Sequence, residues 1–199
     1  MSKTCVLCLA KEDAFKKSPK LCNTILIESN YFIVVPCIGP LVAGQVMILS
    51  KEHYPSLASM GSNAMKDFLN LTDSMKKDFS FNDNVLITEH GSVEEQSGGA
   101  CITHAHVHWI PTFGEHSDSL NNSLPEININ GNLSELVGIK TPYILVVGSD
   151  EKAKAFEAYN AHSQMMRKAI CTKVGRFDWD WAKDPQTKLI EDTIKMWRK

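Results

Sequence analysis

Three histidines at alternate positions inside an apolar run constrain this chain more than any other feature. The run reads His104-Ala105-His106-Val107-His108 and continues into Trp109-Ile110-Pro111. In a strand, successive side chains point to opposite faces, so the three imidazoles would share one face. Imidazole can bind a metal, carry a proton or attack an electrophile near neutral pH. We therefore expect a strand that presents reactive imidazoles; the alternatives are a solvated edge strand and a cluster that only binds metal.

Length, charge and composition narrow the class of protein. A chain of 199 residues with 43% hydrophobic residues can bury one good core. Its formal net charge of −2 argues against nucleic-acid binding through a basic face and favours small-molecule partners. The start, Met1-Ser2-Lys3-Thr4-Cys5, lacks an apolar signal region, and no run approaches the ~18 apolar residues of a membrane span. We expect a cytoplasmic protein that binds neither nucleic acid nor membranes.

Short apolar runs separated by turn residues predict a sheet in the first part of the chain. A helix is expected after Ser62, because apolar residues from Met65 to Phe79 recur at three- and four-residue steps, and its methionines should pack in the core. Strands around one or two helices indicate an α+β fold. The expected strands are Thr24–Glu28, Tyr31–Val35, Gln45–Leu49, Val85–Thr88 and Ile102–Ile110.

The second half of the chain is expected to form an extension. The segment Thr112–Lys140 is rich in Asn, Ser and Gly, which predicts a long loop. We therefore divide the chain into a catalytic core of residues 1–112 and a loop with an extension, residues 113–199, that packs on the core. The elements expected in the extension are a strand at Tyr143–Val147, a helix from about Glu151 to Lys173 and a last helix from Asp184-Pro185 to Trp197.

The histidine run resembles the signature of the histidine-triad (HIT) superfamily, His-x-His-x-His followed by apolar residues. Gly98 to Thr103 precedes it, and Gly44 to His53 looks like the second characteristic block of that family, in family order. The resemblance covers about residues 5 to 111. More loosely, Ser163 to Arg167 and Arg176 to Trp179 are similar to the C-terminal extension of a zinc-containing, bacterial-type branch. The resemblance implies a homodimer and a mostly antiparallel sheet of about five strands with helices packed on it, plus a C-terminal α/β extension.

The resemblance also implies a chemistry. In that superfamily the middle histidine, here His106, attacks the α-phosphorus of a nucleotide, and water or another acceptor resolves the nucleotidyl-histidine intermediate. A backbone carbonyl holds its other ring nitrogen, and the last histidine, here His108, binds phosphate oxygens. Backbone amides near Gly99, Ala100 and Cys101 are expected to bind the phosphate as well. This implies a hydrolase or nucleotidyltransferase that cleaves a phosphoanhydride or phosphoramidate and needs no organic cofactor.

The motif Cys5-Val6-Leu7-Cys8 supplies two ligands, whereas a structural zinc site generally has four. Zinc-containing relatives complete the tetrahedron with a histidine after the third strand and with the first triad histidine, which correspond here to His53 and His104. The resemblance therefore implies a structural zinc ion held by Cys5, Cys8, His53 and His104. The alternative is a pair of unmetallated thiols on a loose N-terminus.

Some positions depart from the family pattern. No acid occurs in Val35–Pro40, where many small HIT hydrolases hold the ribose, and Glu89 and Cys101 stand where many have Asn and Ser or Thr. Glu89 could bind a ribose hydroxyl, assist a proton transfer or cap a turn. Arg167 shares a helical face with Ser163 and Gln164 and could reach a phosphate, but we favour a solvated helix edge.

Three functions remain open at this point. The first is hydrolysis of a dinucleoside polyphosphate or a nucleoside phosphoramidate. The second is transfer to phosphate or a sugar phosphate, as in phosphorylases and uridylyltransferases. The third is a nucleotide-sensing protein with weak turnover. The residues Glu89 and Cys101, at positions where many relatives differ, favour this function, whereas the intact His106 argues against it.

Overall fold

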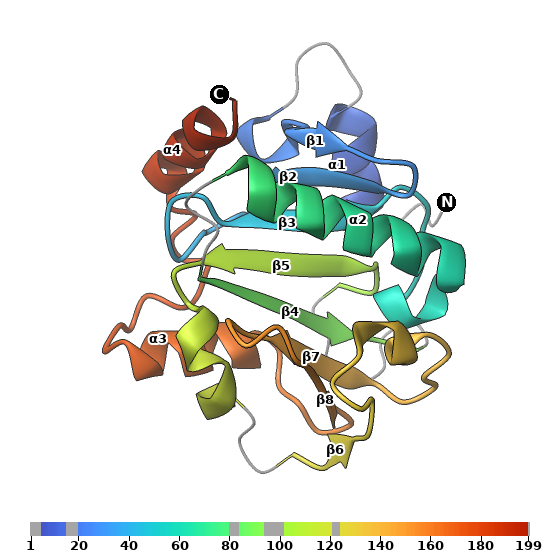
Figure 1. Cartoon of the computed structure of the whole chain (residues 1–199). Helices are drawn as coiled ribbons and strands as arrows, with labels where there is room; N and C mark the ends of the chain where they lie inside the picture. Colours follow the sequence, from blue (N-terminus) through green and yellow to red (C-terminus); the bar gives the residue numbers. More distant parts are fainter. Residues whose placement is uncertain (1–4, 15–19, 80–83, 94–101, 121–123, 199) are drawn as a thin grey trace.

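One antiparallel sheet runs through the molecule, with helices on both of its faces (Figure 1). The computed structural model describes residues 5–14, 20–79, 84–93, 102–120 and 124–198. The elements, in chain order, are α1 (Val6–Ala14), η1 (Leu21–Asn23), β1 (Ile27–Glu28), β2 (Phe32–Pro36), β3 (Val46–Ser50), η2 (Leu57–Ser59), α2 (Ser62–Asp78), β4 (Val85–Gly91), β5 (His106–Pro111), η4 (Gly114–Leu120), β6 (Glu126–Ile127), η5 (Leu133–Leu136), β7 (Tyr143–Val147), β8 (Ala153–Glu157), α3 (Met165–Lys173) and α4 (Thr187–Trp197).

The strands from both halves of the chain form a single sheet. Its order is β1-β2-β3-β5-β4-β7-β8-β6, so β5 lies between β3 and β4, and β4 pairs with β7 of the expected extension. The α+β class is therefore confirmed, but the sheet formed by the described residues has eight strands in place of about five. The additional strands arise because β7, β8 and β6 continue the sheet from the edge of β4. The boundary between residues 112 and 113 stays a prediction.

Helix α2 covers the front face of the sheet in Figure 1. Its residues Met65, Phe68 and Met75 are buried in one cluster with Phe32 of β2 and Trp109 of β5. Burying each of these side chains contributes roughly 1.5–3 kcal/mol. The prediction that the methionines of this helix pack in the core is confirmed.

Helices α1 and α3 pack on the opposite face. Leu7 of α1 joins a cluster with β2 and β3 residues, and Ile170 of α3 joins a cluster with β4, β5 and β7 residues. Because side chains alternate along a strand, Trp109 of β5 points toward α2, whereas His106 and His108 point to the side of α1 and α3. This alternation places the two histidines beside a cavity between these helices.

The helix expected from Glu151 to Lys173 is wrong in its first half. Ala153–Glu157 is β8, which pairs with β7 in antiparallel register, and helix begins only at Met165. Lys, Ala and Glu favour a helix locally, but the free edge of β7 offers a hydrogen-bonding partner along the whole segment. Tertiary pairing therefore overrides local propensity here.

The long loop expected at Thr112–Lys140 is also wrong, because the described part of it contains η4, β6 and η5. Ile129 and Leu136 are buried in the α2-side cluster. Polar residues such as Asn132, whose side chain accepts from the Ser134 N–H at 2.9 Å, shape the turns between these elements. The described part of the segment thus packs against the sheet.

Helix α4 ties the C-terminal part of the chain to the turn before β3. The indole Nε1 of Trp197 donates to the Gly44 carbonyl at 2.9 Å, and the Gly44 N–H donates to Thr193 Oγ1 at 2.9 Å. The Trp197 ring also lies 4.4 Å, centroid to centroid, from the ring of Phe79, the residue that follows α2. These contacts connect the last helix to the turn before β3 and to the end of α2.

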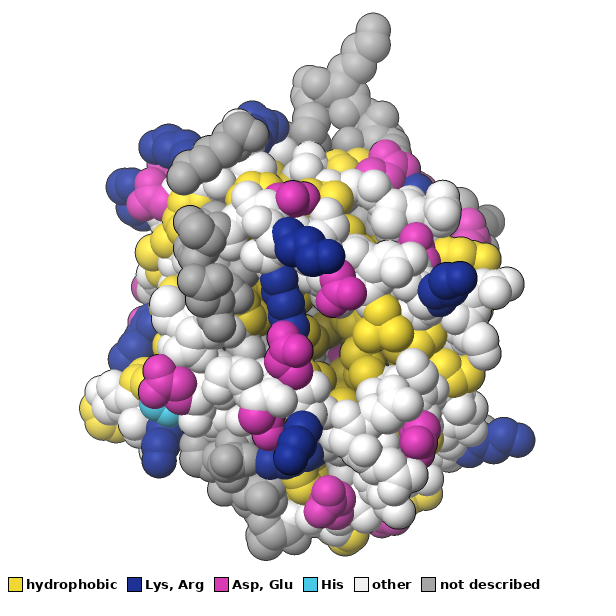
Figure 2. Space-filling model, in the orientation of Figure 1, with side chains coloured by type: hydrophobic (Ala, Val, Ile, Leu, Met, Phe, Trp, Pro, Cys, Tyr) yellow, Lys and Arg dark blue, Asp and Glu magenta, His cyan; other side chains and the backbone are white. Residues whose placement is uncertain are grey.

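The face shown in Figure 2 carries basic and acidic side chains that alternate around a hydrophobic area near its centre. Within the described ranges, every helix is too short or too polar to span a bilayer.

Candidate functional site

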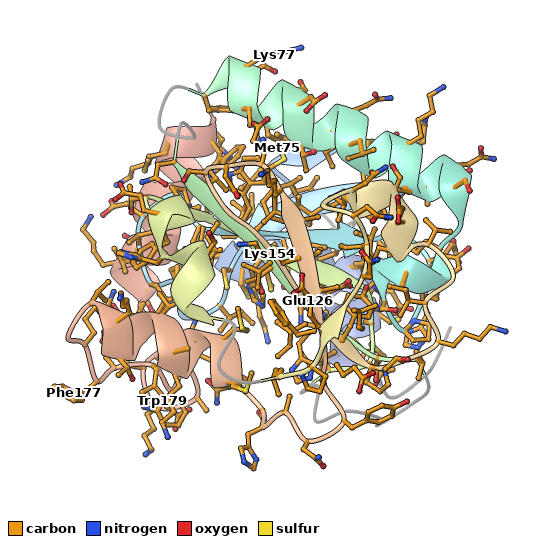
Figure 3. All side chains as sticks on the ribbon, turned by 60° about the horizontal axis from the view of Figure 1, so that its bottom comes forward. Met75, Lys77, Glu126, Lys154, Phe177 and Trp179 are labelled. Carbon is orange, nitrogen blue, oxygen red and sulfur yellow. The ribbon has the colours of Figure 1, made fainter. Side chains whose placement is uncertain are left out.

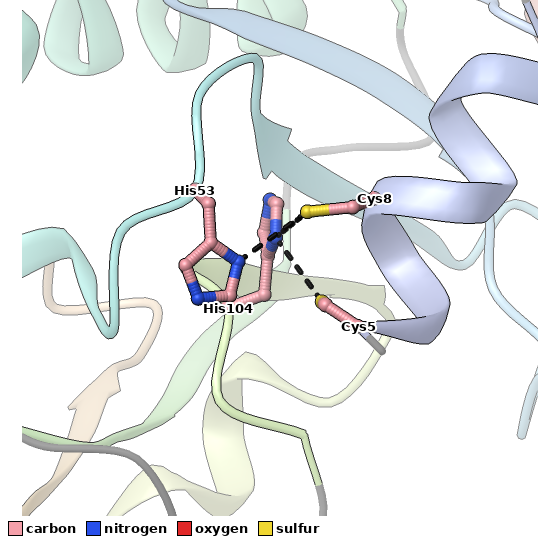
Figure 4. Close-up of side chains that lie close together, drawn as sticks. All are labelled: Cys5, Cys8, His53 and His104. Atoms are coloured by element: carbon pink, nitrogen blue, oxygen red, sulfur yellow. Dashed lines mark hydrogen bonds between the residues drawn. The ribbon is translucent and has the colours of Figure 1, made fainter. Parts of the chain in front are cut away.

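Four metal-binding side chains converge from separate parts of the chain (Figure 4). Cys5 and Cys8 come from the start of α1, His53 follows β3, and His104 immediately precedes β5. Cys8 Sγ lies 3.3 Å from His53 Nδ1 and 3.5 Å from His104 Nδ1, and Cys5 Sγ lies 3.6 Å from His104 Nδ1. All four ligand atoms lie within 4.8 Å of one another, so the cluster can hold a metal ion.

The geometry of this cluster fits a tetrahedral ion. In a tetrahedral zinc site, with bonds of about 2.3 Å to sulfur and about 2.1 Å to nitrogen, a sulfur ligand and a nitrogen ligand lie about 3.6 Å apart. The sulfur–nitrogen distances of 3.3 to 3.6 Å in this cluster are close to that value. The His104 Nε2 lies 3.0 Å from the Ser50 carbonyl and donates to it, so Nδ1 carries the lone pair that faces the thiols. Burial lowers the pKa of His104 to about 4, which keeps the ring neutral and able to act as a ligand.

Lys11 secures the helix that carries the two cysteines. Its buried ammonium donates to the Ser50 carbonyl at 3.1 Å and to the Lys51 carbonyl. Ser50 O therefore accepts from both Lys11 and His104, which joins α1 to the end of β3 and to the entry of β5.

A cavity of about 120 Å³ lies on the same side of the sheet, next to this cluster. Most of its wall is apolar, and a small number of polar side chains point into it, which is the usual character of a small-molecule site. The polar lining residues are Gln45, Thr88, His90, His106, His108, Gln164 and Arg167, and the apolar ones include Leu7, Met47, Ile102, Met165 and Trp181.

His106 is held in one orientation and one tautomer. Its Nδ1 lies 2.5 Å from the His104 backbone carbonyl, which can only accept, so Nδ1 carries the proton and Nε2 the lone pair. Burial lowers the pKa of His106, so the ring is neutral near pH 7. A fixed neutral imidazole with an available lone pair is suited to nucleophilic attack.

His108 lies beside His106 in the cavity, with ring centroids 5.5 Å apart. Burial, together with the charges of His106 and Arg167, lowers the pKa of His108 to about 3. His108 Nδ1 lies 3.7 Å from the buried Cys37 thiol. The residue is therefore a neutral hydrogen-bonding group rather than a cation.

Glu89 does not line the cavity. It is buried on the opposite, α2-facing side of β4, where its carboxylate accepts from the Leu57 N–H at 3.0 Å and from the Tyr143 hydroxyl. It also accepts from the backbone N–H of His106. The interpretation of Glu89 as the cap of a turn is wrong, because residues 89–91 continue strand β4 and pair with β7.

The remaining predicted site residues divide in two groups. Gly99, Ala100 and Cys101 lie outside the described residues, so their expected role stays a prediction. The expectation that Arg167 lies on a solvated helix edge is wrong, because its side chain is buried and lines the cavity with Gln164.

The sequence analysis missed Thr88, which also lines the cavity. The signal was its two-residue spacing from Leu86, which places both side chains on one face of the strand.

Comparison with protein families gives one decisive match. Residues 1–124 match the family model described as protein similar to CwfJ C-terminal, which is a HIT-like family. The chain belongs to this family. The resemblance to the HIT superfamily that the histidine run carries is thereby confirmed. The matched residues of this CwfJ C-terminal-like chain include the four side chains that could hold a metal ion, together with His106 and His108.

Solved structures similar to this CwfJ C-terminal-like chain share low identity with it. A HIT family hydrolase from Clostridium thermocellum is 18% identical, with 56% of this chain and 92% of that chain covered and a TM-score of 0.39. A hypothetical protein from Leishmania major is 24% identical, with 56% and 75% covered and a TM-score of 0.42. A hypothetical histidine triad nucleotide-binding protein from Sulfolobus tokodaii is 21% identical, with 44% and 59% covered and a TM-score of 0.35. A comparison with curated proteins gives no match.

Proposed function

We propose that this chain is a nucleotide-binding enzyme that cleaves a nucleotidyl phosphoanhydride or phosphoramidate bond, with His106 as the nucleophile. The observation that carries the proposal is the contact between His106 Nδ1 and the His104 carbonyl, which leaves the Nε2 lone pair on a ring that lines the cavity. The HIT-like family to which the chain belongs supports the same chemistry.

The reaction proceeds in two displacements. In the first, the Nε2 lone pair of His106 attacks the α-phosphorus, and the leaving group departs with the electron pair of its own bond to that phosphorus. The His104 carbonyl stabilises the imidazolium that forms, because it accepts from Nδ1–H throughout. In the second, an acceptor such as water attacks the same phosphorus, gives up its proton and returns the N–P electron pair to His106.

We also propose that the ion held by Cys5, Cys8, His53 and His104 is zinc and that its role is structural. Two thiolates and two neutral imidazoles form a common donor set for structural zinc. Bound there, zinc supplies folding energy, since it joins α1 to the residues just after β3 and just before β5.

A product assay tests the proposed reaction and identifies the acceptor. Purified protein is incubated with diadenosine tetraphosphate, with and without inorganic phosphate, and the products are separated. Hydrolysis gives AMP and ATP, whereas phosphorolysis gives ADP and ATP only when phosphate is present. His106→Asn, which keeps a side chain that can hydrogen-bond to the His104 carbonyl, should abolish both reactions.

The same assay can contradict the proposal. Turnover by the His106→Asn protein at a near-normal rate would assign the chemistry to another residue. Absence of turnover by a folded wild-type protein that binds the nucleotide would indicate a nucleotide-sensing function in place of an enzyme.

A further inference from the structure

Three residues that line the cavity beside His106 each carry a buried polar atom without a hydrogen-bond partner. Among the described residues, four buried side-chain polar atoms lack a partner, and three of them, Thr88 Oγ1, Gln164 Oε1 and Arg167 Nη1, belong to residues that line this cavity. A buried polar group without a partner costs about 1–3 kcal/mol. Their concentration at one place indicates that a ligand completes these hydrogen bonds.

Arg167 is fixed in the cavity wall by the segment that follows α3. Its Nε donates to the Trp179 carbonyl at 2.8 Å, and Trp179 lies beside α3 at the edge of the molecule in Figure 3. Arg167 is only 9% exposed. The guanidinium is therefore positioned before any ligand binds, with Nη1 as the donor left to use.

Among the described residues, the charge of Arg167 meets no counter-charge in the cavity wall. None of the described residues that line the cavity is acidic. Asp178, whose pKa Arg167 helps to lower, is engaged by the guanidinium of Arg176 through a hydrogen bond and an ion pair. A buried cation of this kind is expected to bind an anionic group of the ligand.

Gln164 presents an acceptor to the same cavity. Its Nε2 donates to Asp180 Oδ1 at 3.3 Å, and a carboxylate can only accept, so the amide cannot be flipped without losing this bond. The carbonyl Oε1 is therefore the atom of Gln164 that remains available to accept a hydrogen bond from a ligand. Thr88, whose strand position is paired with His108, adds a hydroxyl that can donate or accept near the histidines.

We propose that the C-terminal part of the chain completes the nucleotide site: Arg167 binds a phosphate oxygen of the substrate, and Gln164 accepts a hydrogen bond from a hydroxyl or amino group of its nucleoside. This assignment rests on the proposed function and adds two positions to it. It makes Arg167 a fixed source of positive charge at the phosphate, whereas burial lowers the pKa of His108 in the free protein and leaves that ring one N–H to offer. Arg167 and Gln164 lie beyond residues 1–124, so the site needs the region outside the family match.

Equilibrium binding measured by titration calorimetry tests this assignment without requiring turnover. The probes are AMP, adenosine and inorganic pyrophosphate, and the proteins are wild type, Arg167→Gln, Arg167→Lys, Gln164→Leu and Lys173→Gln. Lys173 is an exposed basic residue on the same helix and serves as the matched control. Thermal unfolding of each variant verifies that it is folded.

The expected result separates the two new positions. Arg167→Gln should weaken AMP binding roughly 10- to 100-fold and leave adenosine binding unchanged, because only AMP carries the phosphate. Gln164→Leu should weaken AMP and adenosine by similar factors, roughly 3- to 10-fold. Arg167→Lys should give an intermediate loss for AMP, since an ammonium keeps the charge but not the forked geometry. Lys173→Gln should bind like the wild type.

Two results would overturn the assignment. One is unchanged AMP affinity in both folded Arg167 variants, and the other is an equal loss of AMP and adenosine affinity, which would mean that Arg167 only supports packing. Binding of pyrophosphate that depends on Arg167, in a protein that binds neither AMP nor adenosine, would support the anion site and contradict the nucleotide function.

Discussion

The hydroxyl of Tyr143 donates a hydrogen bond to the carboxylate of Glu89 inside the sheet, where both side chains are buried. The same carboxylate accepts from the backbone N–H groups of Leu57 and His106. It therefore joins β7 and η2 to the first residue of β5. Although Glu89 lies outside the cavity, it is hydrogen-bonded to the backbone of the proposed nucleophile, His106.

Protonation of Glu89 should make stability depend on pH. Burial raises its pKa from the ordinary value of 4.5 to about 7, so the folded protein holds this proton more tightly than the unfolded chain does. The resulting contribution to the free energy of unfolding is complete below about pH 4.5 and is lost as the pH rises through 7. Its size is on the order of 3 kcal/mol.

Urea unfolding of wild type and Glu89→Gln at several pH values measures this contribution. Histidines with lowered pKa values, such as His108, act in the opposite direction below neutral pH, but they are present in both proteins and cancel in the difference. Relative to Glu89→Gln, the wild type should lose stability between pH 4.5 and pH 8. A difference that stays constant across this range would show that Glu89 does not titrate there.

Gly91 should be required for the position of Tyr143. A Cβ built on Gly91 would lie 2.3 Å from the Tyr143 ring, so Gly91→Ala must displace the ring whose hydroxyl is hydrogen-bonded to Glu89. We expect a loss of about 1–3 kcal/mol in the free energy of unfolding. Tyr143→Phe, which removes only the hydroxyl, gives the cost of the hydrogen bonds alone, and a Gly91→Ala protein as stable as wild type would show that the ring can relax without cost.

Loss of one thiol should release the metal. Cys8→Ser replaces a ligand that lies within 3.5 Å of both His53 Nδ1 and His104 Nδ1, and we expect the zinc content to fall from about one ion per chain and the melting temperature to fall with it. Cys22→Ser is the matched control, because Cys22 lies outside the cluster. Elemental analysis that finds no metal in carefully prepared wild type would contradict the zinc proposal, and equal metal in both variants would contradict the ligand set.

The last helix should contribute to the stability of the whole sheet. Trp197 is buried, contacts Phe79 and donates to the Gly44 carbonyl, so Trp197→Ala should lower the free energy of unfolding by about 3–5 kcal/mol. Glu191→Ala changes an exposed residue on the same helix and should have little effect. Separate unfolding transitions for the two halves, with the first unaffected by Trp197→Ala, would contradict this coupling.

The sequence predicted the parts of the site that depend on local spacing or on the family resemblance. Alternation along β5 places His106 and His108 on one face, and the resemblance led to the four metal-binding side chains that the structure brings together. The sequence did not predict that Gln164 and Arg167, in the C-terminal part of the chain, line the cavity. Arg167 occupies a helix position that looks solvated in sequence, and only the packing of α3 against the sheet and the carbonyl of Trp179 bury it.

The errors in secondary structure have a similar cause. Ala153–Glu157 carries helix-forming residues, but it becomes β8 because β7 has a free edge. The first helix, α1, was not expected, because its apolar pattern is short and its burial depends on β2 and β3. Contacts between segments distant in the chain decided these cases, and local patterns do not contain them.

The most direct test of the account is the detection of a covalent nucleotide on His106. Wild type, His106→Asn and the exposed-histidine control His162→Asn are mixed with a nucleotide labelled at the α-phosphorus and quenched in alkaline denaturant, which preserves a phosphorus–nitrogen bond. The account predicts label on the peptide that contains His106 in wild type and His162→Asn, and none in His106→Asn. Catalysis by wild type at a normal rate without a trapped adduct on His106 would contradict it.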